Sequence, residues 1–421
     1  MSSRIQNTAI RLLRWSEKYT KTNMVYLAEG GFWLVLGQVV SFVISFLLSI
    51  AFANLLPKEA FGTYRFILSL AGIVTAFSLT GMNTAVTRAV ARGNDGVYTK
   101  SIPIQLRWGV LTALVSFAIS AYYLLNHNSV LALGLLLVGV FMPLINAFST
   151  HAAFFNGKKD FRRLMIFGLA GTLSTSIATL VGLLVTKSAL ALVFLYLLST
   201  ALSSIVLFFG SLKYVKKTPV FDNREAISYG KHLSASGFIS IAAQNVDKVL
   251  VFHFLGSIDL AIYTFALLIP DYVGKFFKNI WSLSLPKFAV SDGSSSKFRS
   301  LFIHKMILLT IVVVILMIIY IMLAPFVFSI FYPTYTNAVP FSQVAALYLL
   351  VFVPVLSSSF FNARGKKKII YSLSISESLF RVIATYVGVY YFGLWGAIWA
   401  LVAFAIFSFC LSWLFVFKSV R

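Results

Sequence analysis

The chain has 421 residues, of which 59% are hydrophobic and only 11% are charged, whereas an ordinary soluble domain carries about 25% charged residues. So few charges cannot cover a surface that faces water, which excludes a soluble enzyme and indicates an integral membrane protein. The net charge of +23 would favour nucleic acid as a partner, but the bases lie in short clusters between apolar runs, so membrane topology explains them better and we expect no nucleic-acid partner.

The first predicted element is a basic, amphipathic segment. Residues 4–21 interleave five bases with Ile, Leu and Trp side chains. This pattern is typical of a helix that lies on the anionic surface of a membrane; a frayed basic tail is the alternative. No apolar core with a small-residue cleavage site follows, so we expect no cleavable signal peptide.

Twelve apolar stretches come next, each long enough to cross the hydrocarbon core of a bilayer, which takes about 17–25 residues. They cover residues 31–54, 66–87, 108–125, 129–155, 165–186, 188–212, 233–255, 258–283, 303–330, 339–362, 369–390 and 395–417. The predicted fold class is therefore an all-α integral membrane protein with about 12 transmembrane helices.

The longest connection, residues 213–232, separates six spans from six. We divide the chain into an N-terminal interfacial segment (1–29), a six-helix half (30–212), a cytoplasmic linker (213–232) and a second six-helix half (233–421). A faint repeat supports the division, because a Phe-Gly-Thr-Tyr-Arg-Phe motif after the first span resembles Leu-Ala-Ile-Tyr-Thr-Phe after the seventh. Since six is even, both halves enter from the same side, and we expect parallel repeats around a central cavity.

The distribution of charge tests this topology independently. Most of the 35 Lys and Arg residues fall in the N-terminal segment, in the connections that follow even-numbered spans and at the C-terminus, while the other connections hold almost none. Because cytoplasmic loops carry an excess of bases, both termini are expected in the cytoplasm.

The sequence lacks the signatures of catalysis and of metal binding. A single cysteine, Cys410, excludes an internal disulfide framework and a Cys-rich metal site. The stretch Gly157-Lys158-Lys159 lacks the preceding glycine and the following hydroxyl of a nucleotide-binding loop. We therefore expect no enzymatic activity, no cofactor and no metal.

The seventh span, residues 233–255, is the richest in polar side chains. They recur every three or four residues, which places them on one face of a helix, and they are Ser236, Ser240, Gln244, Asp247 and Lys248. A charge at the centre of a membrane helix costs about 3 kcal/mol on insertion scales, so such residues are candidates for function. They either line a transport cavity or neutralise partners on neighbouring helices.

Two other spans carry charged residues. Glu377 and Arg381 lie four residues apart in the eleventh span, where they would either form an internal ion pair or leave Arg381 to bind a phosphate. In the eighth span Pro270 precedes Asp271, and Lys275 follows one turn later. A proline kink is common beside a transport cavity, although it can be purely structural.

Several patches of sequence resemble one family of membrane proteins. They are residues 51–66 (AFANLLPKEAFGTYRF), 77–96 (FSLTGMNTAVTRAVARGNDG), 155–161 (FNGKKDF), 245–263 and 392–400 (FGLWGAIWA). In this order and spacing, with the layout of six spans plus six, they resemble the polysaccharide-transport branch of the MOP exporter superfamily, the Wzx-type flippases of lipid-linked oligosaccharides.

The resemblance implies a function in the bacterial inner membrane. Such proteins carry an undecaprenyl-diphosphate-linked oligosaccharide to the outer leaflet, for O-antigen of lipopolysaccharide, capsule or exopolysaccharide, by alternating access of two halves. The implied partners are this substrate, membrane lipids and a polysaccharide polymerase. Cations for the diphosphate would be Lys248, Arg381 and Lys275, and groups for the saccharide would be Gln244, Asn245 and Gln38. The family tends to have an acidic residue in the seventh span, here Asp247.

Two other functions remain as alternatives. A MATE-type small-molecule antiporter would share the architecture, but the cations within the spans disfavour cationic drugs, since like charges repel in a low-dielectric cavity. A membrane polysaccharide polymerase or ligase would be expected to carry a sizeable outer loop, and the predicted outer connections are short.

Overall fold

The computed structural model describes residues 24–216, 224–282, 296–363 and 367–420 of the chain. All described elements are helical, as predicted, and the fold is that of an all-α membrane protein. The interfacial helix predicted at residues 4–21 lies outside the described residues.

The helices before the long connection include both long helices and short segments. They are α2 (Met24–Leu55), α3 (Lys58–Val74), η1 (Thr75–Phe77), α4 (Met82–Ala91), α5 (Gly96–Leu125), α6 (Ser129–Phe148), α7 (His151–Gly157), α8 (Phe161–Val185) and α9 (Ala189–Leu212).

The described helices after that connection include three of 32 residues or more, which are longer than a single span needs. In chain order the helices are α10 (Arg224–Leu255), α11 (Ser257–Ser282), α13 (Ser296–Phe331), η2 (Pro333–Ala338), α14 (Val339–Ala345), η3 (Ala346–Phe352), α15 (Pro354–Ala363) and α16 (Lys367–Val420). The three long ones are α10, α13 and α16. Helix α10 starts at Arg224, so helix already occupies part of the segment expected to be a linker, 213–232.

Ten stretches of the described residues are long and apolar enough to cross a membrane, where the sequence predicted about 12. One difference lies in α16, because a single stretch, Ile369–Val416, holds two predicted spans. The chain reverses at Gly393, whose φ of 58° favours glycine. Beyond this turn Ser408 donates a hydrogen bond of 2.5 Å to Glu377 Oε1, which a straight helix would hold far apart.

The other difference is the predicted second span, residues 66–87, which is broken. Helix α3 ends at Val74, and after the 3-10 turn Ser78 has an extended backbone with ψ 173°. Helix α4 then begins at Met82, where the backbone N–H of Gly81 donates to Ser234 Oγ of α10 at 2.9 Å. Because neither piece is long enough alone, this segment is not among the ten described stretches.

The outer surface of the helices is apolar, as lipid contact requires. On α13, for example, one turn after another exposes a large aliphatic or aromatic side chain. These are Ile307, Leu308, Ile311, Ile315, Ile318, Ile319, Met322, Leu323, Phe326 and Ile330.

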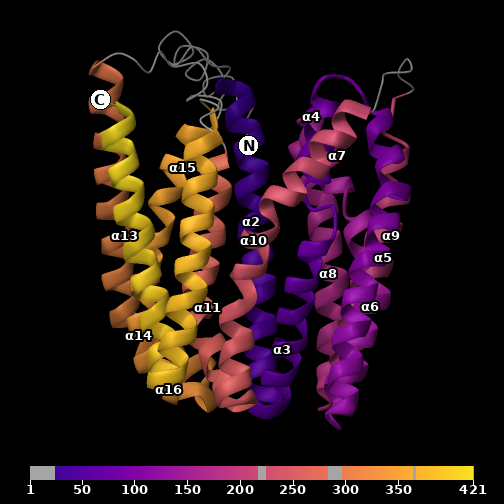
Figure 1. The fold of residues 1–421 in the computed structure, drawn as a ribbon, viewed down its shortest axis with the longest axis vertical. Helices are drawn as coiled ribbons and strands as arrows, with labels where there is room; N and C mark the ends of the chain where they lie inside the picture. Colours follow the sequence, from indigo (N-terminus) through magenta and orange to yellow (C-terminus); the bar gives the residue numbers. More distant parts are fainter. Residues whose placement is uncertain (1–23, 217–223, 283–295, 364–366, 421) are drawn as a thin grey trace, which may run out of the picture.

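The helices before the long connection, α2–α9, form one group, and those after it, α10, α11 and α13–α16, form the other. Helices α4–α9 lie on one side of the molecule and α11 and α13–α16 on the other, with α2, α3 and α10 at the centre (Figure 1). The first residues of α2 and the last of α16 lie at the same end, which we call the terminal end. Helix α10 packs against α4 and also against α3 and α16, so it contacts both groups.

At the opposite end, aromatic rings from both groups pack together. Phe61 of α3 lies 5.0 Å from the ring of Phe265 on α11, which in turn lies 3.9 Å from Tyr335. Gly62 contacts the backbone of α11, since a Cβ there would lie 1.8 Å from the carbonyl oxygen of Ser257. We call the rings of Phe52, Phe61, Phe265, Tyr332 and Tyr335 the aromatic seal.

Candidate functional site

A cavity of about 230 Å³ lies between the two helix groups. Helices α2, α3 and α9 line it from one side and α11 from the other, and its polar groups include Ser45, Ser49, Arg65 and Asp271. Ser45 and Ser49 are one turn apart on α2, so both hydroxyls lie on the same face. Asp271, one of the candidates selected from the sequence, lines this cavity.

Arg65 is a charged residue of the cavity that the sequence analysis did not select. Because α3 begins at Lys58, Arg65 lies two turns inside the helix. Its Nε is buried and has no hydrogen-bond partner. The start signal that could have revealed this position is Pro57, since proline commonly precedes the first turn of a helix.

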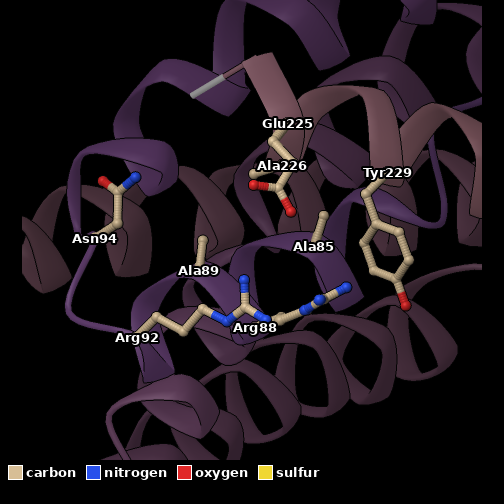
Figure 2. Close-up of a pocket in the computed structure, with 8 residues that line it drawn as sticks. All are labelled: Ala85, Arg88, Ala89, Arg92, Asn94, Glu225, Ala226 and Tyr229. Carbon is tan, nitrogen blue, oxygen red and sulfur yellow. The ribbon is translucent and has the colours of Figure 1, made fainter. Parts of the chain in front are cut away.

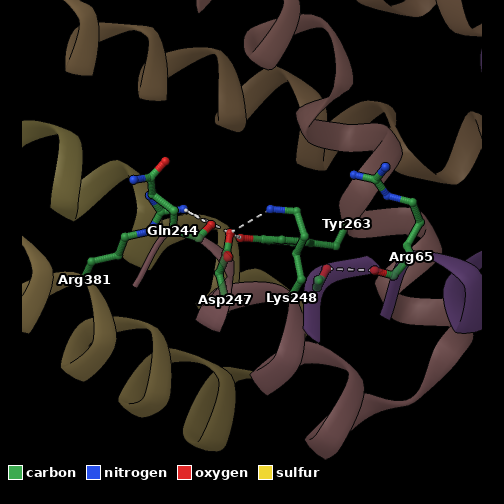
Figure 3. Close-up of polar contacts among 7 residues, drawn as sticks. Arg65, Gln244, Asp247, Lys248, Tyr263 and Arg381 are labelled. Carbon is green, nitrogen blue, oxygen red and sulfur yellow. Dashed lines mark hydrogen bonds and ion pairs between the residues drawn. The ribbon is translucent and has the colours of Figure 1, made fainter. Parts of the chain in front are cut away.

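Asp247 and Lys248 of α10 meet Arg381 of α16 and Tyr263 of α11 in a buried cluster around Asp247 (Figure 3). Its Oδ2 accepts a hydrogen bond from Arg381 Nη2 at 3.2 Å and one from the Tyr263 hydroxyl at 3.0 Å. Lys248 Nζ lies 3.6 Å from the same oxygen. The structure thus brings together three residues selected from sequence, Asp247, Lys248 and Arg381, and adds Tyr263.

One carboxylate cannot neutralise two bases, so the cluster of Asp247, Lys248 and Arg381 keeps a formal charge of +1. The side chain of Asp247 is 1% exposed and those of Lys248 and Arg381 are 13% and 12% exposed. In such surroundings an uncompensated charge is costly, and a bound anion would offset it. Arg381 Nε is buried without a hydrogen-bond partner, which leaves a donor of the guanidinium unused.

Glu377 and Arg381 make no ion pair in the described part of the chain. Glu377 accepts the hydrogen bond from Ser408 within the α16 hairpin, and Arg381 turns instead to Asp247 and lies 5.4 Å from the centre of the Phe404 ring. Of the two possibilities left open by the sequence, the internal pair is therefore absent.

Three other residues selected from the sequence are described, two on α10 and one on α2. Gln244 is exposed, and its backbone carbonyl oxygen accepts a hydrogen bond of 3.4 Å from Arg381 Nη2. Asn245 packs against α3, because a Cβ on Gly72 would lie 2.6 Å from its Nδ2. Gln38 is half-buried on α2, two turns before Ser45. The side chain of Lys275 lies outside the described residues.

The fold is similar to solved structures of transporters. An inward-facing multidrug resistance MATE transporter of the MOP superfamily is 15% identical, with a TM-score of 0.70 over 91% of this chain and 98% of that one. An outward-facing structure of the same description gives 14% and 0.67, over 93% and 95%. A MOP superfamily transporter from Pyrococcus furiosus, whose reversed pocket polarity is reported to suggest a different function, gives 14% and 0.64, over 93% and 95%.

At these identities the likeness shows the fold, which is the MATE-like fold of the MOP superfamily. No curated protein sequence matches the chain. Residues 27–269, more than half of the chain, match the family model described as polysaccharide biosynthesis protein. This match agrees with the resemblance found in the sequence patches. The chain therefore belongs to the polysaccharide biosynthesis protein family.

Proposed function

We propose that the protein is a flippase that carries an undecaprenyl-diphosphate-linked oligosaccharide across the bacterial inner membrane. The observation that carries this proposal is the buried cluster of Asp247, Lys248 and Arg381, which retains a positive charge within the membrane. A diphosphate supplies the missing negative charge, and guanidinium groups bind phosphate oxygens in a bidentate manner. Family membership supports a role in polysaccharide biosynthesis.

Arg65 extends this role to the other helix group. It lines the cavity from α3. Lys248 and Arg381, on α10 and α16, belong to the cluster around Asp247 and do not line this cavity, and Figure 3 shows all three bases in one view. In our proposal the diphosphate binds between these three bases, so that both groups contact it. The serine hydroxyls of α2, with Gln38 and Gln244, would bind the sugar residues, since hydroxyl and amide groups pair well with saccharide hydroxyls. Asn245, which packs on α3, would support α10.

We further propose twelve passes, in two six-helix halves (30–212 and 233–421) that alternate between inward-open and outward-open states, with both termini in the cytoplasm. The broken α3–α4 segment supplies one pass beyond the ten stretches. The other comes from α16, which is counted once among the ten but has two arms. The aromatic seal closes the end opposite the termini, so the arrangement suits a state open toward the cytoplasm. A polysaccharide polymerase would act on the product in the outer leaflet.

The test uses purified protein in liposomes that contain a diphosphate-linked oligosaccharide. Transport is measured as the fraction of the glycan that becomes accessible to a glycosidase added outside. We expect Arg381→Gln and Lys248→Gln to slow transport at least tenfold, since each loses a charge-assisted bond worth about 1.5–3 kcal/mol. Lys187→Gln is the matched control, because Lys187 is exposed in a connection and bonds only the Leu183 carbonyl.

Normal transport by both variants would contradict the assignment of the cluster to the diphosphate. Deletion of the gene separates the proposed function from its rivals. Loss of surface glycan with lipid-linked oligosaccharide retained on the cytoplasmic face is the expected result. Oligosaccharide that reaches the outer leaflet unpolymerised would indicate a polymerase instead, and unchanged glycan with altered drug tolerance would indicate an antiporter.

A further inference from the structure

A second cavity, of about 190 Å³, lies away from the proposed transport pathway, between the end of α4 and the start of α10 (Figure 2). One face of α4 lines it with residues three or four apart. These are Ala85, Arg88, Ala89 and Arg92. Glu225, Ala226 and Tyr229, from the first two turns of α10, form the facing wall, and Asn94 lies at the rim.

The close packing of α4 against α10 fixes this cavity. The Gly81 amide donates to Ser234 Oγ, and a Cβ on Gly81 would lie 2.6 Å from the Gly230 carbonyl oxygen. Further along α4, the small side chains of Ala85 and Ala89 line the cavity. The walls are thus parts of ordered helices rather than of a loop.

The two arginines are available to a ligand. Neither Arg88 nor Arg92 forms an ion pair within the described residues, although Glu225 lines the same cavity. The guanidinium of Arg88 lies over the ring of Tyr229, 4.8 Å from its centre, which holds it in place. Figure 2 shows the side chains of Arg88 and Arg92 along one side of the cavity, with Glu225 above them.

The position of the cavity matches the level of the lipid head groups. Helix α4 ends and α10 begins at the terminal end of the molecule (Figure 1). Other bases of this end also lie over aromatic rings, for example Arg162 over Trp33 at 5.5 Å and Lys213 over Tyr214 at 5.1 Å. Aromatic rings and bases at a helix end are typical of the membrane interface, and basic pockets there bind phosphate-bearing head groups.

We propose that this cavity binds a phosphate group presented at the membrane surface, with Arg88 and Arg92 as the binding residues. Two guanidinium groups supply the forked donors that phosphate oxygens prefer. The first backbone N–H groups of α10 add a partial positive charge, as at other helix starts. The negative charge of Glu225 repels a bound anion and lowers the affinity of the site. The site is separate from the central cluster and does not depend on the transport substrate.

The test counts bound lipids by native mass spectrometry on the full-length protein from nanodiscs of phosphatidylglycerol or phosphatidylcholine. We expect a retained phosphatidylglycerol on the wild type, and about tenfold weaker retention in Arg88→Gln and in Arg92→Gln. Glu225→Gln should strengthen retention, because it removes the opposing charge. Lys213→Gln is the matched control, since this base also lies over a tyrosine ring at the terminal end of the molecule.

A second arm distinguishes a lipid from a free anion. Inorganic pyrophosphate is titrated into the detergent-solubilised protein and its affinity is measured by calorimetry. Pyrophosphate that binds the wild type and is lost in both arginine variants would support a phosphate site that takes free anions. Equal lipid retention and equal pyrophosphate affinity in wild type and both arginine variants would overturn the proposal. Both arginines are exposed, so their replacement should leave folding unchanged.

Discussion

At the scale of single residues, Asp247 has two tasks. It pairs with Arg381 and with Lys248, and its single negative charge neutralises only one of these two bases. Breaking a buried ion pair by removal of one partner costs about 3–5 kcal/mol, because the other partner stays buried and unpaired. The structural and functional roles of Arg381 can therefore be separated. Replacing Asp247 alone leaves two buried bases without a carboxylate, whereas replacing Asp247 and Arg381 together returns the cluster to one positive charge and still removes the guanidinium from the substrate.

We predict that Asp247→Asn lowers the thermal stability of the solubilised protein, because Arg381 and Lys248 then stay buried with no carboxylate beside them. The double variant Asp247→Asn with Arg381→Leu should recover most of the stability but should not transport. Thermal unfolding and the liposome assay give the two readouts. A double variant that transported normally would show that Arg381 is not needed to bind the substrate.

The structure brings together part of the predicted site. The periodicity of the seventh predicted span selected Asp247 and Lys248, and both lie in the cluster with Arg381. The sequence did not predict their partners, because Arg381 is more than a hundred residues away and its pairing depends on how α16 packs against α10. Arg65 was missed since a base at the edge of an apolar run has the same local pattern whether it faces lipid head groups or a cavity.

At the scale of elements, α3 and α11 of the two groups approach each other closely at Gly62. A Cβ on this residue would lie 1.8 Å from the backbone of Ser257, so even alanine forces the helices apart. The same two helices carry Phe61 and Phe265 of the aromatic seal. The glycine therefore matters for how tightly this end of the molecule closes.

Gly62→Ala should lower the melting temperature and raise the labelling of residues behind the seal by a reagent added from the outside. The reagent would react with a cysteine introduced at Ser49, which lines the cavity, in a background where Cys410 is replaced by Ser. Gly168→Ala is the control, because a Cβ there meets no atom within 4 Å. Unchanged labelling in Gly62→Ala would mean that the seal does not depend on this contact.

Element boundaries were harder to predict than elements. The apolar stretches indicated where helices lie, and the gap between the predicted spans 369–390 and 395–417 contains the turn at Gly393. The break after Val74 was not predicted, since Ser78 and Thr80 are mild interruptions in an otherwise apolar run. This break is accompanied by a tertiary contact that the sequence does not report, that between Gly81 and Ser234.

At the scale of the whole molecule, the two helix groups are joined at the end opposite the termini by hydrogen bonds as well as by rings. Asn54 Nδ2 donates to the Phe331 carbonyl at 3.2 Å, and Thr334 Oγ1 donates to the Ala53 carbonyl at 2.7 Å. If the halves alternate as proposed, these contacts must break once in each cycle. Covalent links across them should then stop transport.

We predict that Asn54→Cys with Phe331→Cys, joined by a short thiol cross-linker, abolishes transport until a reductant is added. Replacement of Cys410, the single native cysteine, gives the background. Ser120→Cys with Ala132→Cys is the control, because this pair links α5 to α6 within one group, where Ser120 bonds the Ala132 carbonyl. Full transport by the cross-linked Asn54 and Phe331 pair would exclude a cycle that opens this end.

Helix α10 imposes a mechanical condition on any such cycle. Its first turns are fastened to α4 in one group, and its last turns hold Arg381 of α16 in the other, with no break in the helix between Arg224 and Leu255. The groups therefore cannot swing as two independent bodies. Either α10 bends between Ser234 and Asp247, or its contact with α4 breaks. In both cases a movement of one group is transmitted to the other through α10.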